Sequence, residues 1–120
     1  PDMRIRILGK TWNFRFGTVA EMPRDFGACD PPHTRGKEIT VRDDIRGRLL
    51  ADTVIHESLH AGAWHQLDEE FIERLATDVS KLLWRPEILR RLLDDDEVRS
   101  ALAEPVAEGP TNQPIAEVLP

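Results

Sequence analysis

Apolar and polar residues alternate through the first part of the chain, with the two-residue period of a β-strand that has one buried face. The alternation runs over residues 3–8 and resumes over residues 12–16, and Gly9 and Lys10 form a tight turn between the two runs. We therefore expect a β-hairpin over residues 3–17. Its second strand is expected to direct three aromatic side chains toward the core: Trp12, Phe14 and Phe16.

The pattern changes twice between residue 21 and the first helix. Residues 21–37 contain three prolines and two glycines, so we expect a long loop without a regular element. Residues 37–42 (KEITVR) alternate again and predict a third short strand. Asp43 and Asp44, which follow this strand, are candidates to cap the N-terminus of a helix.

Helical periodicity replaces the alternation from about residue 44 onward. Apolar residues recur at spacings of three and four over residues 44–64 and over residues 68–84, which predicts two amphipathic helices. Pro86 separates the second helix from a short third one in PEILRRLL. This order of elements predicts an α+β fold, in which a short antiparallel sheet of about three strands packs on a helical hairpin.

Composition divides the chain into one domain and a tail. A chain of 120 residues with 40% hydrophobic residues suffices for one domain with a modest core, which we assign to residues 1–93. Residues 94–120 are rich in acidic residues and proline and poor in large apolar groups. We expect this tail to be mobile, above all from about residue 104, because it cannot bury enough surface to offset its ordering entropy.

Charge and cysteine content narrow the class of protein. The formal net charge of −6 gives no indication of nucleic-acid binding. The single cysteine, Cys29, excludes an intrachain disulfide, and no apolar run approaches the length of a membrane span. These features together predict a cytoplasmic protein.

Three of the four histidines lie within VIHESLHAGAWH, residues 54–65. In the HESLH part of this segment, His56 and His60 are one helical turn apart, so both imidazoles project from the same face and can reach one cation. A glutamate directly after the first histidine completes the HExxH pattern of zinc hydrolases. We expect His56 and His60 to bind Zn²⁺, and Glu57 to act as the general base that deprotonates metal-activated water in peptide-bond hydrolysis.

Catalytic zinc sites take three protein ligands, so a further one is expected. His65 comes nine residues after His56, one short of the metzincin spacing, and Gly62 is out of that register as well. The other source is an acid in LDEEFIERLATD, because thermolysin-type sites take a glutamate from the following helix. At 100° per residue, Glu69 falls at the edge of the apolar face and Glu73 lies on the same edge a turn later. Glu69 is the first choice, with Glu73 and His65 as alternatives.

HESLHAGAWH followed by LDEEFIERLATDVSKLLW resembles the small zincin-like metallopeptidases of phage and bacteria. These are related to the minimal gluzincins and, more distantly, to SprT-like and ImmA/IrrE peptidases. The resemblance covers about residues 3–85. It implies a short antiparallel sheet before the HExxH helix, zinc ligands at His56 and His60, the base at Glu57, a third ligand at Glu69, and a protein or peptide substrate.

Other interpretations stay open beside this one. A chain this short has little room for a substrate cleft, which favours a non-catalytic zinc-binding or regulatory module that keeps the zincin fold; an accidental HExxH in an interaction protein is a further alternative. Cys29 is expected to be a small buried hydrophobe, with a thiol that reaches the zinc, or a metal pair with His33, as the alternatives. The strand at residues 37–42 is a candidate edge for binding an extended peptide.

Overall fold

The computed structural model describes residues 3–103, which fold into a four-stranded mixed sheet and four helices. The expected α+β class is therefore confirmed. The elements, in chain order, are β1 (Met3–Ile7), β2 (Lys10–Gly17), β3 (Gly27–Cys29), β4 (Glu38–Arg42), α1 (Gly47–Gly62), α2 (Glu69–Leu83), α3 (Pro86–Leu93) and α4 (Asp96–Ala103).

The expected hairpin forms between β1 and β2, with its turn one residue earlier than expected. Leu8 and Gly9 occupy the turn with φ angles of 49° and 81°, and two positive φ angles match the right-handed twist of the flanking strands. On β2, Trp12 and Phe14 are buried as expected. The expectation was wrong for Phe16, which is 49% exposed and meets the Phe14 ring edge to face at a centroid distance of 5.6 Å.

The sheet differs from the expected three antiparallel strands. Its strand order is β1-β2-β4-β3, and β4 runs parallel to β2, while the other two pairings are antiparallel. The long segment after β2 brings the chain back to the end of the sheet at which β2 begins, so β4 runs in the same direction as β2. Within this segment, three residues form β3. The sequence pattern did not indicate this strand, because the residues around it are typical of turns. Because β4 has neighbours on both sides, residues 37–42 are not an edge strand; among the described strands, β1 and β3 form the edges.

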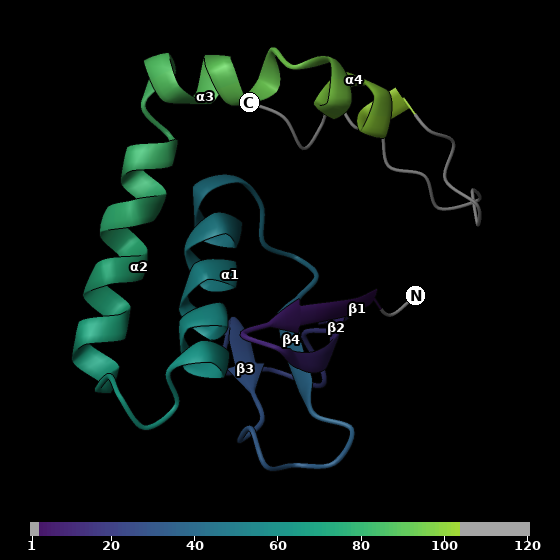
Figure 1. Cartoon of the computed structure of the whole chain (residues 1–120), viewed down its shortest axis with the longest axis vertical. Coiled ribbons are helices and arrows are strands. Elements are labelled where there is room, and N and C mark those ends of the chain that lie inside the picture. Colours follow the sequence, from purple (N-terminus) through teal and green to yellow (C-terminus); the bar gives the residue numbers. More distant parts are fainter. Residues whose placement is uncertain (1–2, 104–120) are drawn as a thin grey trace.

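Helix α1 lies between the sheet on one side and α2 on the other (Figure 1). The contact between the sheet and α1 contains the main apolar core, to which burial of each large side chain contributes roughly 1.5–3 kcal/mol. Six buried residues make up this core: Trp12, Phe14, Ile39, Val41, Ile45 and Ala61.

Helix α1 begins later than its periodicity suggests. Gly47 takes a positive φ of 63°, which favours glycine and turns the chain into the helix. Arg46 is the N-cap residue and makes no side-chain capping bond. The expectation that Asp43 or Asp44 caps the helix was therefore wrong; the carboxylate of Asp44 accepts a hydrogen bond from Arg42 Nε at 2.7 Å.

Helix α2 runs antiparallel to α1 and starts at a capped turn. Asp68 Oδ1 accepts a hydrogen bond from the Phe71 backbone N–H at 2.8 Å, which fixes the first turn of the helix. At the other end of the helix pair, Arg48 Nη1 on α1 donates to Ser80 Oγ on α2 at 3.4 Å. The buried face of α2 repeats every four residues: Ile72, Ala76 and Ser80.

Helices α3 and α4 turn at the end of α2 and run across the view above α1, and neither contains a buried residue (Figure 1). Helix α4 lies within the segment assigned to the tail, and Asp95 Oδ1 accepts the N–H of Glu97 at 2.7 Å at its start. Residues 104–120, for which mobility is expected, lie outside the described residues. In the part of the chain that is described, every helix is too short or too polar to cross a membrane.

Candidate metal centre

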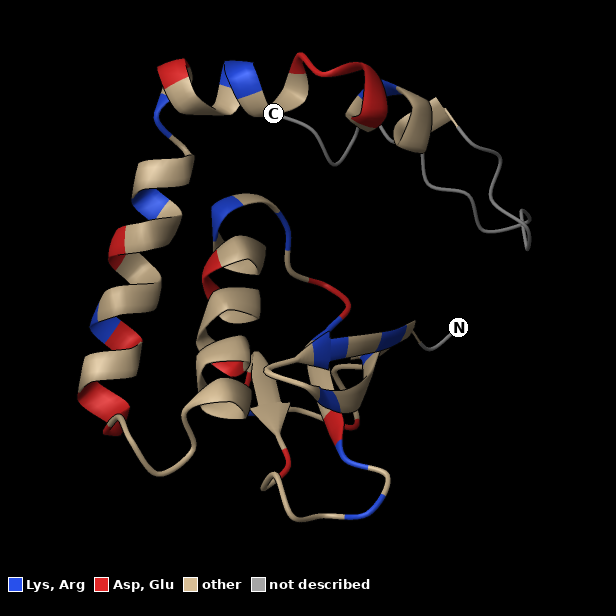
Figure 2. Cartoon of the chain, viewed as in Figure 1, with Lys and Arg blue, Asp and Glu red and all other residues tan. Residues whose placement is uncertain are grey.

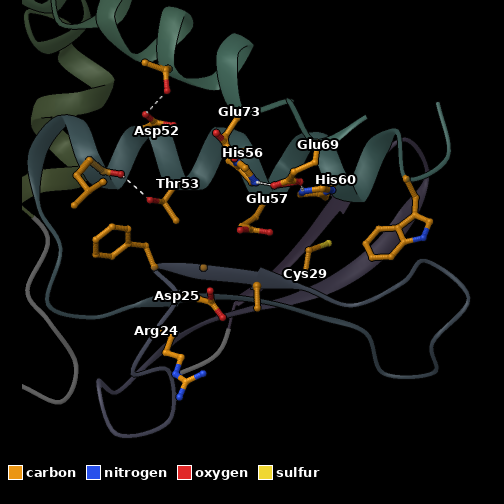
Figure 3. Close-up of a pocket in the computed structure, with 16 residues that line it drawn as sticks. Arg24, Asp25, Cys29, Asp52, Thr53, His56, Glu57, His60, Glu69 and Glu73 are labelled. Carbon is orange, nitrogen blue, oxygen red and sulfur yellow. Dashed lines mark hydrogen bonds and ion pairs between the residues drawn. The ribbon is translucent and has the colours of Figure 1, made fainter. Parts of the chain in front are cut away.

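The two histidines of HESLH stand side by side on α1 and point toward the start of α2 (Figure 3). Their ring centroids are 4.9 Å apart, as expected for residues one helical turn apart. Both side chains are mostly buried, with 18% of His56 and 22% of His60 exposed. The helix thus presents two nitrogen ligands in one partly shielded place.

Glu69, in the first turn of α2, completes the group. His56 Nε2 lies 3.0 Å from Glu69 Oε1, and His60 Nε2 lies 2.7 Å from Glu69 Oε2. The first contact is a hydrogen bond, and the second brings the other carboxylate oxygen within ion-pair distance of His60. The ligand atoms of these three residues all lie within 4.8 Å of one another. The structure therefore brings together the residues expected as first-choice ligands.

This group could hold a metal ion, and its donor atoms are of a kind that zinc accepts. Two imidazole nitrogens and one glutamate oxygen are a ligand set found in catalytic zinc sites. Ligands at about 2.0–2.1 Å from zinc are roughly 3.4 Å apart in a tetrahedral arrangement. The observed separations of 3.0 and 2.7 Å are shorter, so binding of zinc would require the Glu69 side chain, which is 57% exposed, to move back.

The two alternative third ligands lie outside this group. Glu73 lines the same groove one turn further along α2, while Glu69 sits nearer to both imidazoles. His65 follows the end of α1, where Ala63 leaves the helical conformation with φ −138° and ψ 46°. It is exposed and lines a different hollow beside Leu8.

Glu57 points toward a different wall from His56, because successive residues of a helix are turned by 100°. It lies between α1 and β3 and is 7% exposed (Figure 3). Within the described part of the chain, no hydrogen bond or ion pair reaches its carboxylate. Burial raises the pKa of Glu57 to about 7; the nearby His56 opposes this shift, and the negative charges of Glu69 and Asp25 add to it.

Gly27 on β3 makes room for this carboxylate. A Cβ atom at residue 27 would lie 2.9 Å from both Cγ and Oε2 of Glu57, and 2.7 Å from Cγ2 of Thr53. These distances are too short for van der Waals contacts, so a side chain at this position would require the side chains of Glu57 and Thr53, or the elements that carry them, to shift. The absence of a side chain at Gly27 allows Glu57 to be buried against the strand.

A groove of about 620 Å³ connects these residues. One wall is formed by α1 and α2, and the other by β3 and the residues just before it (Figure 3). Because β3 is an edge strand, its unpaired backbone groups border the groove. The lining carries five carboxylates, together with one guanidinium from Arg24: Asp25, Asp52, Glu57, Glu69 and Glu73.

Cys29 also lines the groove, from β3, while His33 lies elsewhere beside His65. The thiol is half-buried and donates to the backbone oxygen of Asp30 at 3.4 Å. Burial, with the negative charges of Glu57 and Asp30, raises the pKa of Cys29 to about 12. The thiol is thus a neutral part of the groove wall, and it does not join the group formed by the two imidazoles and Glu69.

Comparison with known proteins finds no matching family model, no matching curated protein and no matching solved structure. The resemblance carried by HESLH and the LDEE segment therefore remains an expectation.

Asp52, Asp25 and Gly27 are among the groove residues that the sequence did not indicate as part of a site. Asp52 precedes His56 by four residues, so the helical spacing that links His56 to His60 also predicts its position. Asp25 and Gly27 lie in a segment interpreted as an irregular loop, and their approach to α1 depends on the pairing of β3 with β4. No local pattern in the sequence indicates that pairing.

Proposed function

We propose that this protein is a zinc-dependent metallopeptidase with a zincin-like arrangement of its helices. The observation that carries the proposal is the convergence of His56 Nε2, His60 Nε2 and the Glu69 carboxylate, at 3.0 and 2.7 Å, beside the buried Glu57. Of the possible zinc-site types, a two-histidine and glutamate set with a neighbouring carboxylate matches a hydrolytic site rather than a closed structural one.

Each residue has a distinct part in the proposed reaction. His56, His60 and Glu69 would hold the ion, and zinc, when bound, supplies Lewis acidity to a carbonyl oxygen and lowers the pKa of water. Glu57 takes the proton from the attacking water at a carboxylate oxygen and delivers it to the nitrogen of the leaving amine.

The shape of the groove supports a peptide as substrate. Edge strand β3 lies along the groove and offers backbone donors and acceptors to an extended chain, which is a common way to bind peptides without strict side-chain selection. Residues 37–42 cannot serve in this way, because both sides of β4 are already paired.

Zinc analysis and peptide cleavage, measured on matched variants, test this proposal. The wild type and Glu57→Gln should each bind one zinc ion, and the wild type alone should cleave unfolded proteins or a peptide library. Zinc that is bound without any cleavage would favour the non-catalytic zinc-binding or regulatory module. Failure to take up zinc would overturn both interpretations.

The same assay identifies the third ligand. Glu69→Ala should lower zinc affinity by more than about 100-fold, because it removes a direct ligand, whereas Glu73→Ala and His65→Ala should keep it within about tenfold of the wild type. Competition with a chromophoric chelator measures these affinities. Loss of zinc in Glu73→Ala or His65→Ala, with Glu69→Ala unaffected, would replace Glu69 in the site.

A further inference from the structure

The groove continues beyond the metal centre as two facing rows of polar side chains. On α1 the row is Asp52, His56 and His60, each four residues after the last, and Asp52 lies beyond His56 on the side away from His60 (Figure 3). On α2 the corresponding row is Glu69, Glu73 and Thr77. The helices are antiparallel, so the end of one row faces the start of the other.

Asp52 and Glu73 therefore line the part of the groove next to the metal centre. Thr77 Oγ1 donates a hydrogen bond to Asp52 Oδ2 at 2.9 Å, which fixes this partly buried carboxylate and leaves its other oxygen free to accept. Glu73 is exposed and lines the groove from α2. Leu49, three residues before Asp52 and 41% exposed, adds an apolar surface at the same end.

The charge of the groove is strongly negative. Five carboxylates and one guanidinium line it, so a bound divalent cation would still leave negative charge in excess. Glu57 adds a buried carboxyl group to the same lining: it is 7% exposed, and no hydrogen bond or ion pair reaches it from the described residues. The charges of the molecule are unevenly placed, with basic residues along β1 and acidic residues at the start of α2 (Figure 2).

We propose that the groove selects peptides with a lysine or arginine side chain close to the bond that is cleaved, and that Asp52 and Glu73 determine this specificity. This inference rests on the proposed peptidase function. A long cationic side chain can lay its apolar stem along Leu49 and place its charged end between the two carboxylates. An acidic side chain at the same place would be repelled.

Two fluorescence-quenched peptides that differ at one residue test this specificity. One carries lysine and the other norleucine, which has an unbranched stem of similar length without the charge, and the residue is moved through the positions flanking the cleaved bond. With the zinc-loaded wild type at low salt, kcat/KM should be about tenfold higher for the lysine peptide at one of these positions. The ratio should fall at about 0.5 M salt.

Variants assign the preference to the two carboxylates. The double variant D52N/E73Q keeps an amide oxygen at residue 52 that can still accept from Thr77, and it should bring the lysine-to-norleucine ratio to about one. The double variant E70Q/D78N removes the same charge from the outer face of α2 and should keep the wild-type ratio. Thermal unfolding of each variant shows that the fold is retained.

The outcomes separate this inference from the proposed function. Cleavage with equal rates for both peptides, or a preference that persists in D52N/E73Q, would overturn the inference and leave the peptidase function standing. If no peptide is cleaved, the proposed function fails. Fluorescence anisotropy of the same peptides on the zinc-loaded protein then tests whether the groove still prefers a cationic side chain. Tighter binding of the lysine peptide that D52N/E73Q abolishes would support the inference, and equal binding would overturn it.

Discussion

Replacing Glu57 by glutamine should stabilise the metal-free protein at high pH and not at low pH. In the folded protein, burial raises the pKa of Glu57 from 4.5 to about 7, so the folded state holds this proton more tightly than the unfolded state does. A group with a raised pKa contributes its full stability below pH 4.5, and that contribution is lost as the pH rises through about 7. The wild type should therefore become less stable between these values.

The size of the effect follows from the shift. One pKa unit corresponds to about 1.4 kcal/mol, so ionisation of Glu57 should lower the free energy of unfolding by about 2 to 3 kcal/mol between about pH 5 and pH 8. Glutamine has nearly the same shape and does not ionise. Relative to wild type, Glu57→Gln should therefore gain about 2 to 3 kcal/mol over this pH range.

Urea unfolding of the chelator-treated proteins at both pH values measures this difference, and effects of the substitution that do not depend on pH cancel. Glu70→Gln is the matched control, because Glu70 is exposed on the outer side of α2 and pairs with Arg74 at 3.6 Å. The control should change stability by the same small amount at both pH values. If the effect of Glu57→Gln is also the same at both pH values, folding does not raise the pKa of Glu57, and the prediction is wrong.

Three further predictions concern the surroundings of the site. Gly27→Ala should destabilise the protein by about 1 to 3 kcal/mol in urea unfolding, because the Cβ of the new alanine would overlap Glu57. Gly62→Ala should be neutral or stabilising. Equal effects of the two substitutions would refute the close approach of Gly27 to Glu57. Asp68→Ala should remove the α2 cap, lower stability by about 1 kcal/mol and weaken zinc binding about tenfold, whereas the same change at the α4 cap, Asp95, should leave zinc affinity unaltered. Cys29 should react with iodoacetamide at about pH 8 at least roughly 100-fold more slowly in the metal-free native protein than in urea, and similar rates would show an accessible thiolate.

Both helices of the site could be predicted from the sequence because helical spacing converts position into direction. Two histidines four residues apart must project together, and the phase of the apolar face placed the two candidate acids, Glu69 and Glu73, on one edge of the second helix. The structure places Glu69 against both imidazoles, with the α2 cap at Asp68 fixing its turn. The geometry of a single helix was therefore sufficient to predict the positions of these three side chains.

The opposite wall of the groove could not be predicted in this way. Strand β3 has three residues in a segment dominated by proline, glycine and charge, and it exists because Gly27 and Cys29 pair with Val41 and Ile39 on β4. The parallel pairing of β2 with β4 is equally non-local, since the alternation of each strand is the same in either direction. Strand direction and sheet order depend on how the intervening segment crosses the sheet.

The two walls are linked by the adjacency of His56 and Glu57. Because neighbouring helix residues diverge by 100°, a helix that directs one toward α2 must direct the next toward the sheet. A carboxylate on that inner face would ordinarily be excluded from the core, and Ala61, one turn later on the same face, is buried and apolar. Glu57 is tolerated there because the element packed against it is an edge strand with a glycine at the contact, which leaves the carboxylate buried but open to the groove. The HExxH spacing therefore constrains more than the metal ligands: it requires a strand with little side-chain bulk beside the helix, and in this chain Gly27 meets that requirement.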